Sequence, residues 1–236
     1  MNPLNKLIAV PVSYLGVWRR SLLEQNGNQD TTSLVFWLQA DNQHIDIRIP
    51  ALRPDFSDCT CLQDCSTEQL RWLATQQGFA GVTEVNGNIC NWHRELDLQP
   101  DNGVPDIGEM VFSGENKLLE TGVESVYFEV WEKIAGTHIN VSTHQINSLD
   151  SNGVVVIARL LKAGNQFAFI RPRSSNLPEA SSLLALIDTP NQSLLDILNW
   201  LDFEISFGDI VDAAHGRITH STLPFREGQI LNFSLV

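Results

Sequence analysis

Polar and apolar side chains alternate along several short segments of this chain with a period of two residues. The clearest example is a run in which His44, Asp46 and Arg48 alternate with three isoleucines. Such alternation is typical of a β-strand, because successive side chains of a strand point to opposite faces of its sheet. Two-residue turn signals at residues 41–42 and 86–87 separate segments of this kind. The pattern predicts an all-β fold with about seven or eight short antiparallel strands in each half of the chain.

The order of these segments repeats once along the chain. Trp18 precedes two apolar segments joined by a turn at residues 34–50, and Trp131 precedes the same arrangement at residues 154–172. Further markers follow in matching order: Trp92 and Trp200, Asp106 and Asp209, Gly122 and Gly228. The repeat predicts two copies of one β unit, at residues 1–128 and 129–236, unless these are only the tryptophans and turns that any β-rich chain repeats.

The junction between the two copies contains no stretch rich in Pro, Gly or Ser. Residues 127–134 match both the last strand of the first copy and the first strand of the second. We therefore expect one strand to close the first sheet and open the second, so that the two units pack as one body.

Helical signals fall after the third strand of each copy. Ser66 and Gln69 form a capping box before an apolar face, and Gly78 is the expected end of that helix. Residues 178–186 and 193–198 are the matching helical segments of the second copy. Short helical insertions are therefore expected at equivalent positions.

The segment Gly16-Val17-Trp18, near the first strand of a small antiparallel barrel, resembles the lipocalin and calycin superfamily. In that superfamily the tryptophan plugs the closed end of the barrel. The second copy keeps Trp131 but has Glu129 where the glycine would stand. The tandem arrangement also resembles a fungal family of cytosolic proteins with two lipocalin-like barrels and an unsettled biochemical role.

The resemblance implies two tandem lipocalin-like antiparallel β-barrels packed as one body, with short helical insertions. The signal peptide and disulfides of secreted lipocalins are absent, so their role in extracellular transport does not carry over. The glycine-rich first-strand motif of the heme-binding nitrobindin branch is also absent, which argues against heme. We expect no cofactor.

The charge balance restricts the possible partners. The chain carries 15 Lys and Arg against 28 Asp and Glu, a net charge of −13, and has no basic stripe. A nucleic acid or an anionic membrane surface is therefore not an expected partner, whereas a protein partner remains possible. No apolar run is long enough to span a bilayer, and Pro11 cuts the run at residues 7–10 too short for a signal peptide. The expected location is the cytoplasm.

The four cysteines do not predict a metal site or a disulfide framework. Cys59, Cys61 and Cys65 lie within seven residues of one another, and Cys90 is the only other cysteine. Zinc sites prefer two to four residues between paired ligands, whereas one residue separates Cys59 from Cys61. A disulfide framework would be spread over both halves of the chain. We therefore expect reduced thiols and no bound metal.

The candidate ligand pocket lies in the first copy, if its polar strand faces point inward. The predicted ligand-binding residues are Trp18, Trp37, Asp46, Arg48, Trp92, Tyr127, Glu129 and Trp131. In the alternative, the isoleucines fill the core and the polar face meets water. Residues 167–170 are apolar on both faces, which favours coverage of both faces of the equivalent strand in the first copy.

Three functions remain open on this evidence. The first is binding of an apolar or amphipathic small molecule in the first barrel. The second is a cofactor-independent cyclase, isomerase or hydratase of a biosynthetic pathway, with Asp46, Glu95, Asp97 or Glu129 as acid–base candidates. The third is a scaffold whose acidic surface binds a protein. Phosphate-loop and serine-hydrolase motifs are absent, which disfavours those chemistries.

Overall fold

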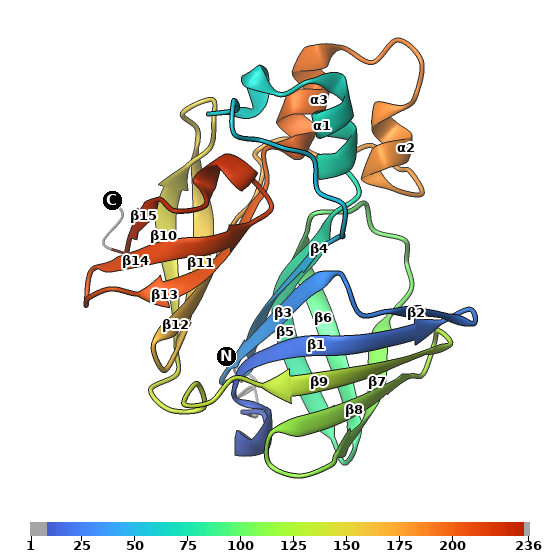
Figure 1. Ribbon diagram of the computed structural model, residues 1–236, viewed down its shortest axis with the longest axis vertical. Coiled ribbons are helices and arrows are strands. Elements are labelled where there is room, and N and C mark those ends of the chain that lie inside the picture. The colour runs from blue at the N-terminus through green and yellow to red at the C-terminus, as the bar shows by residue number, and fades with distance from the viewer. Residues whose placement is uncertain (1–8, 234–236) are drawn as a thin grey trace, which may run out of the picture.

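Residues 9–233 are described by a computed structural model, in which the strands form two antiparallel sheets (Figure 1). The first sheet consists of β1 (Gly16–Gln25), β2 (Asn28–Asp30), β3 (Leu34–Ala40), β4 (Gln43–Ile49), β5 (Gln77–Asn86), β6 (Ile89–Asp97), β7 (Asp106–Phe112), β8 (Lys117–Gly122) and β9 (Tyr127–Lys133). The second consists of β10 (Ser142–Leu149), β11 (Val155–Ala163), β12 (Gln166–Arg171), β13 (Glu204–Ile210), β14 (His215–Ser221) and β15 (Ile230–Asn232). The predicted all-β class is confirmed.

The first sheet closes into a barrel. Its order is β2-β1-β3-β4-β5-β6-β7-β8-β9, and β9 pairs back onto β1 with Trp131 opposite Arg20. The short strand β2 extends the β1 edge and lies outside the ring of eight strands. Closure leaves the ring without an unpaired edge.

The second sheet is a curled half-barrel and is open, unlike the closed second barrel that we expected. Its order is β10-β11-β12-β13-β14-β15, and within residues 9–233 β15 does not pair with β10. Taken in chain order, its six strands correspond to β1, β3, β4, β5, β6 and β7 of the first barrel. Nothing in the described chain corresponds to β8 and β9. The second sheet thus has two strands fewer than the closed ring of the first barrel.

The expectation that one strand is shared between the two sheets is wrong. Both edges of β9 are occupied, one by β8 and the other by β1, so no edge remains for a strand of the second sheet. The second sheet starts with β10, after a connection at residues 134–141. The boundary expected between residues 128 and 129 falls inside β9.

Part of the sequence repeat also fails. Trp92 lies in β6, but its expected partner Trp200 lies in the helix α3 (Leu194–Leu201). Trp131 belongs to the first barrel, as Trp18 does. What remains of the repeat is the hairpin β3–β4 and its counterpart β11–β12, each followed by helical segments.

The main hydrophobic core lies between the two sheets. Ile45, Ile47 and Ile49 on the outer face of β4 join one buried cluster with Ile170 and Ile205 of the second sheet. We call this cluster the intersheet core. Close packing is visible at Gly78 of β5, where an added Cβ atom would come 2.5 Å from Ile205 Cδ1. The two sheets therefore form one packed unit.

Strand β12 of the second sheet is buried on both faces, as its apolar residues 167–170 predicted. Ala168 and Ile170 face the intersheet core, while Phe167 and Phe169 belong to a separate cluster on the opposite face. Phe233 packs against Phe167 there, with ring centroids 5.3 Å apart.

Three α-helices gather at one end of the intersheet core (Figure 1). They are α1 (Thr67–Leu73), α2 (Leu183–Ile187) and α3, inserted between β4 and β5 and between β12 and β13. Ser66 and Gln69 form the predicted capping box of α1, but this helix ends before Gly78, which lies in β5. An ion pair between Arg71 and Asp188 joins α1 to the end of α2.

A truncation in the intersheet core should destabilise both sheets together. Ile47 is fully buried, so we expect Ile47→Ala to lower the free energy of unfolding by about 2–5 kcal/mol. Urea unfolding followed by tryptophan fluorescence and by circular dichroism should show one shared transition. Val126→Ala, at a side chain that is 89% exposed, is the control. A loss below about 0.5 kcal/mol for Ile47→Ala would show that this packing does not hold the sheets together.

Candidate functional site

The polar face of β4 points into the first barrel. Because the isoleucines of this strand pack outward against the second sheet, His44, Asp46 and Arg48 must face the barrel interior. Asp46 is 2% exposed and His44 is fully buried. The alternative in which this face meets water is therefore wrong: the isoleucines do fill a core, but it is the core between the sheets.

Four tryptophans fill one half of the barrel interior. Trp37 lies at the centre of this group, 6.2 Å from Trp18, 5.6 Å from Trp92 and 5.9 Å from Trp131 between ring centroids. We call these four residues the tryptophan cluster. They occupy the space in which a long apolar ligand would have to lie.

One end of the barrel is closed by the segment before β1. The indole Nε1 of Trp18 donates a hydrogen bond of 2.7 Å to the carbonyl oxygen of Tyr14, in the 3₁₀ helix Val12–Tyr14. The Tyr14 ring packs edge-on against Phe112 at 5.0 Å, and Lys133 Nζ lies 4.6 Å above the Trp18 ring. Trp18 thus lies at the plugged end of the first barrel.

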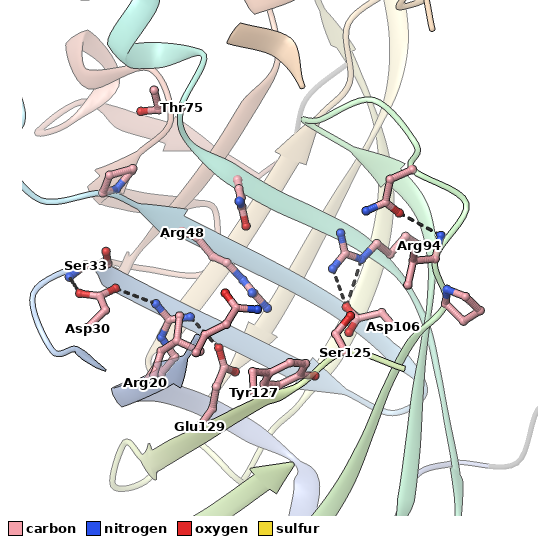
Figure 2. A pocket seen from close by; sticks show the side chains of 17 residues that line it. Arg20, Asp30, Ser33, Arg48, Thr75, Arg94, Asp106, Ser125, Tyr127 and Glu129 are labelled. Atoms are coloured by element: carbon pink, nitrogen blue, oxygen red, sulfur yellow. Dashed lines mark hydrogen bonds and ion pairs between the residues drawn. The ribbon is translucent and has the colours of Figure 1, made fainter. Parts of the chain in front are cut away.

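A cavity of about 380 Å³ occupies the other end of the barrel (Figure 2). We call this cavity the cup. Its lining residues are Arg20, Leu23, Gln25, Asp30, Ser33, Arg48, Pro50, Thr75, Gln77, Arg94, Asn102, Val104, Pro105, Asp106, Ser125, Tyr127 and Glu129. Most of them are polar, and the volume is at the lower end of the range for small-molecule sites.

Two of the three arginines in the cup are held by pairs of carboxylates. Arg20 donates from Nη1 to Glu129 Oε1 at 2.6 Å and from Nη2 to Asp30 Oδ2 at 3.1 Å (Figure 2). Arg94 donates to Asp106 at 2.6 Å and to Asp97 at 3.0 Å. These pairs fix the positions of both guanidinium groups.

The third arginine is held through only one of its nitrogens. Arg48 Nε donates to Asp46 Oδ1 at 2.8 Å. Its guanidinium carbon lies 5.3 Å from the centroid of the Phe79 ring, on which Arg94 also packs, at 3.7 Å. Burial raises the pKa of Asp46 despite the neighbouring Arg48 charge. The floor of the cup is thus a partly exposed arginine paired with a buried carboxylate, beside an aromatic ring.

Two buried carboxyl groups lie directly opposite each other on β8 and β9. Glu120 accepts hydrogen bonds from the Tyr127 hydroxyl at 2.7 Å and from Trp131 Nε1 at 2.9 Å. Burial, together with the nearby Glu129 carboxylate, raises the pKa of Glu120 to about 8. Burial also raises the pKa of Glu129, although Arg48 and Arg20 oppose the shift. Gly108 leaves room for this arrangement, because a Cβ atom there would lie 2.9 Å from Glu120 Cγ.

All eight predicted ligand residues project toward the interior of the first barrel, but at different depths. Arg48, Tyr127 and Glu129 line the cup. Asp46 lies beneath it, beside a void of about 10 Å³ that Trp37, Trp92 and Trp131 also line. Trp18 is deeper still, at the plugged end. The structure therefore brings the polar members together in the cup and places the tryptophans in the packing below.

Sequence reasoning missed several inward-facing charged residues: Arg20, Asp30, Arg94, Asp106 and Glu120. Strand parity could have found two of them, because Arg20 lies two residues after Trp18 and Arg94 lies two residues after Trp92. Glu120 gives a weaker signal, since the apolar Leu118 shares its face of the strand.

Strict alternation would place His93, Glu95 and Asp97 on one face of β6, but the structure does not. The register shifts where this strand passes Ala80 and Gly81 of β5, so side chains on either side of the bulge change faces. Glu95 points away from the cup and pairs with Arg159 of β11 at 2.6 Å. Asp97 is a partner of Arg94. Of the acid–base candidates, Asp46 and Glu129 remain inside the barrel.

The remaining candidate chemistry is sparse. All four cysteines have free thiols, and no group of three or more potential ligands within residues 9–233 could hold a metal ion. Among the helices of that part of the chain, none has the length and apolar character needed to cross a membrane.

Comparison with known proteins gives little guidance. No family model and no curated protein matches the sequence. Among solved structures, the uncharacterized protein YLR301w from Saccharomyces cerevisiae is similar, with a TM-score of 0.47 and 13% sequence identity over 87% of this chain and 84% of that one. A likeness of this size assigns no function to the chain.

The buried Glu120 carboxyl should make stability depend on pH. Its pKa rises from 4.5 in the unfolded chain to about 8 in the fold, so the folded state binds more protons between these values. The stability linked to this proton is complete below about pH 4.5 and is lost as pH rises through about 8. Glu120→Gln keeps a partner for Tyr127 and Trp131 but cannot ionise.

We therefore expect the free energy of unfolding of Glu120→Gln to rise relative to that of the natural chain by roughly 2–3 kcal/mol between about pH 6 and pH 8.5. Urea unfolding at both pH values measures the difference. Glu132→Gln, on the exposed side of β9, should show no such trend. If the difference in free energy of unfolding between Glu120→Gln and the natural chain did not change with pH, Glu120 would ionise as readily in the folded chain as in the unfolded one.

Proposed function

We propose that this chain is a small-molecule-binding protein whose ligand occupies the cup of a lipocalin-like first barrel. The observation that supports this most strongly is the cup itself: a cavity of about 380 Å³ at the open end of a closed barrel, with its charged side chains fixed in place by ion pairs. Fixed polar groups around a preformed cavity lower the cost of ordering a bound ligand.

The lining of the cup favours a polar or amphipathic ligand over a fully apolar one. Arginine, aspartate and glutamate side chains surround the cavity, and the tryptophan cluster fills the barrel below it. A long alkyl chain would have to displace packed indole rings, whereas a compact polar molecule fits above them.

Acid–base catalysis in the same cup is a second candidate. Glu129 lines the cup, and Glu120 lies opposite it on the neighbouring strand, beside the small void beneath the cup. Both carboxyl groups are buried and have raised pKa values. A carboxyl group that stays protonated near neutral pH can donate a proton to a bound molecule. In that case the ligand would be a substrate of a cofactor-independent reaction.

We also place the protein in the cytoplasm. The four free thiols support this location, because disulfides are favoured in oxidising compartments.

A bulky side chain at the mouth of the cup should block binding. Ser125 lines the cup in the β8–β9 turn, whereas Ser113 is exposed in the β7–β8 turn at the opposite end of the barrel. We expect metabolite-library compounds to raise the melting temperature of the natural chain and of Ser113→Trp, but not that of Ser125→Trp. Thermal shift followed by native mass spectrometry of each hit provides the measurement.

The two serine variants also separate specific from unspecific binding. Equal binding to Ser125→Trp and Ser113→Trp would place the ligand outside the cup. A natural chain that binds no compound of a broad library would contradict the proposed function.

A further inference from the structure

The three arginines of the cup differ in how many of their N–H donors remain without an acceptor. Both terminal nitrogens of Arg20 and of Arg94 donate to carboxylates. Arg48 uses only Nε, and its two terminal nitrogens donate to no acceptor in the described part of the chain. A guanidinium group carries five N–H donors, so Arg48 retains an open pair that suits an oxyanion.

The position of Arg48 suits recognition of a ligand. Its side chain is 24% exposed, and this exposed part faces the cup. Asp46 holds the guanidinium group from below at 2.8 Å, and Phe79 packs beside it. Figure 2 shows Arg48 extending into the cavity between Arg20 and Arg94. Its open edge is therefore preorganised to bind a ligand, at little cost in side-chain entropy.

A second unpaired group belongs to Glu129, whose side chain lines the same cup. Glu129 Oε1 accepts the hydrogen bond from Arg20, but Oε2 is buried and has no hydrogen-bond partner. The Glu129 side chain is only 3% exposed. Leaving a buried carboxyl oxygen without a partner is costly, so this atom is suited to pair with a polar group of a ligand.

We propose that the cup binds a compact hydroxylated organic anion, whose carboxylate or phosphate accepts two hydrogen bonds from Arg48 and whose hydroxyl group pairs with Glu129 Oε2. This inference rests on the proposed function and specifies the ligand of the same site. Asp30, Asp106 and Glu129 balance the three arginines of the cup, so the donors left for a ligand are the terminal nitrogens of Arg48, which suit an anion. A long alkyl chain would meet the tryptophan cluster. Sugar phosphates and sugar acids have the required size and groups.

The first test compares matched ligands on the natural chain. The probes are glucose 6-phosphate and gluconate, together with their uncharged counterparts glucose and sorbitol, inorganic phosphate alone and a long-chain fatty acid. Isothermal titration at low salt should show that at least one of the two hydroxylated anions binds about tenfold or more tightly than its uncharged counterpart. Phosphate should bind more weakly than glucose 6-phosphate, because it lacks the sugar hydroxyls.

The second test changes the two open groups and a control. Arg48→Lys keeps the charge beside Asp46 but loses the two-pronged donor, so the affinity for the anion should fall about tenfold or more. Glu129→Gln keeps an acceptor for Arg20 and should change the affinity for the hydroxylated anion more than that for phosphate. Arg19→Lys, at an exposed position of β1, should leave both affinities unchanged.

The outcomes separate this inference from the proposed function. Uncharged compounds or fatty acids that bind as tightly as the anions, and that Ser125→Trp excludes, would overturn the ligand class and leave the cup as a binding site. Anion affinity that is unchanged in a folded Arg48→Lys variant would also overturn it. If Arg48→Lys does not fold, the comparison of matched ligands on the natural chain and on Glu129→Gln decides whether the proposed ligand class is correct.

Discussion

The structure depends on the packing of the β4 isoleucines against the second sheet. A strand that presents apolar side chains outward to a second sheet must turn its other face into the barrel, because alternate residues point in opposite directions. For β4 this places His44, Asp46 and Arg48 in the interior. The half-barrel therefore determines, from outside, that the first barrel has a charged interior.

A charged interior is stable only when its charges are paired, and the cup shows how this is achieved. Arg20 and Arg94 are each neutralised by two carboxylates, and Arg48 is held by Asp46. Glu120 is satisfied by neutral donors, Tyr127 and Trp131. The open positions that remain, on Arg48 and Glu129, lie next to the cavity, which is why the cup is the best-supported site in the described chain.

Local pattern was enough to predict the strand class, the β3–β4 and β5–β6 turns and the Ser66 capping box, but it left open which face of β4 points into the barrel. It could not predict how the strands pair. A repeat of tryptophans suggested equivalence between Trp92 and Trp200, but tertiary packing places one in a strand and the other in a helix. The prediction that both sheets share β9 is wrong because β1 and β8 already pair with its two edges. Hydrophobic periodicity does not reveal which strands pair.

Hydroxyl-radical footprinting of the natural chain can test whether the second sheet covers the isoleucine face of β4. Mass spectrometry reads the oxidation rate of each side chain in proportion to its contact with water. We expect Ile45 and Ile47 to react as slowly as the buried Leu38, and far more slowly than Leu52, which is 96% exposed. Oxidation of these isoleucines at a rate close to that of Leu52 would contradict it.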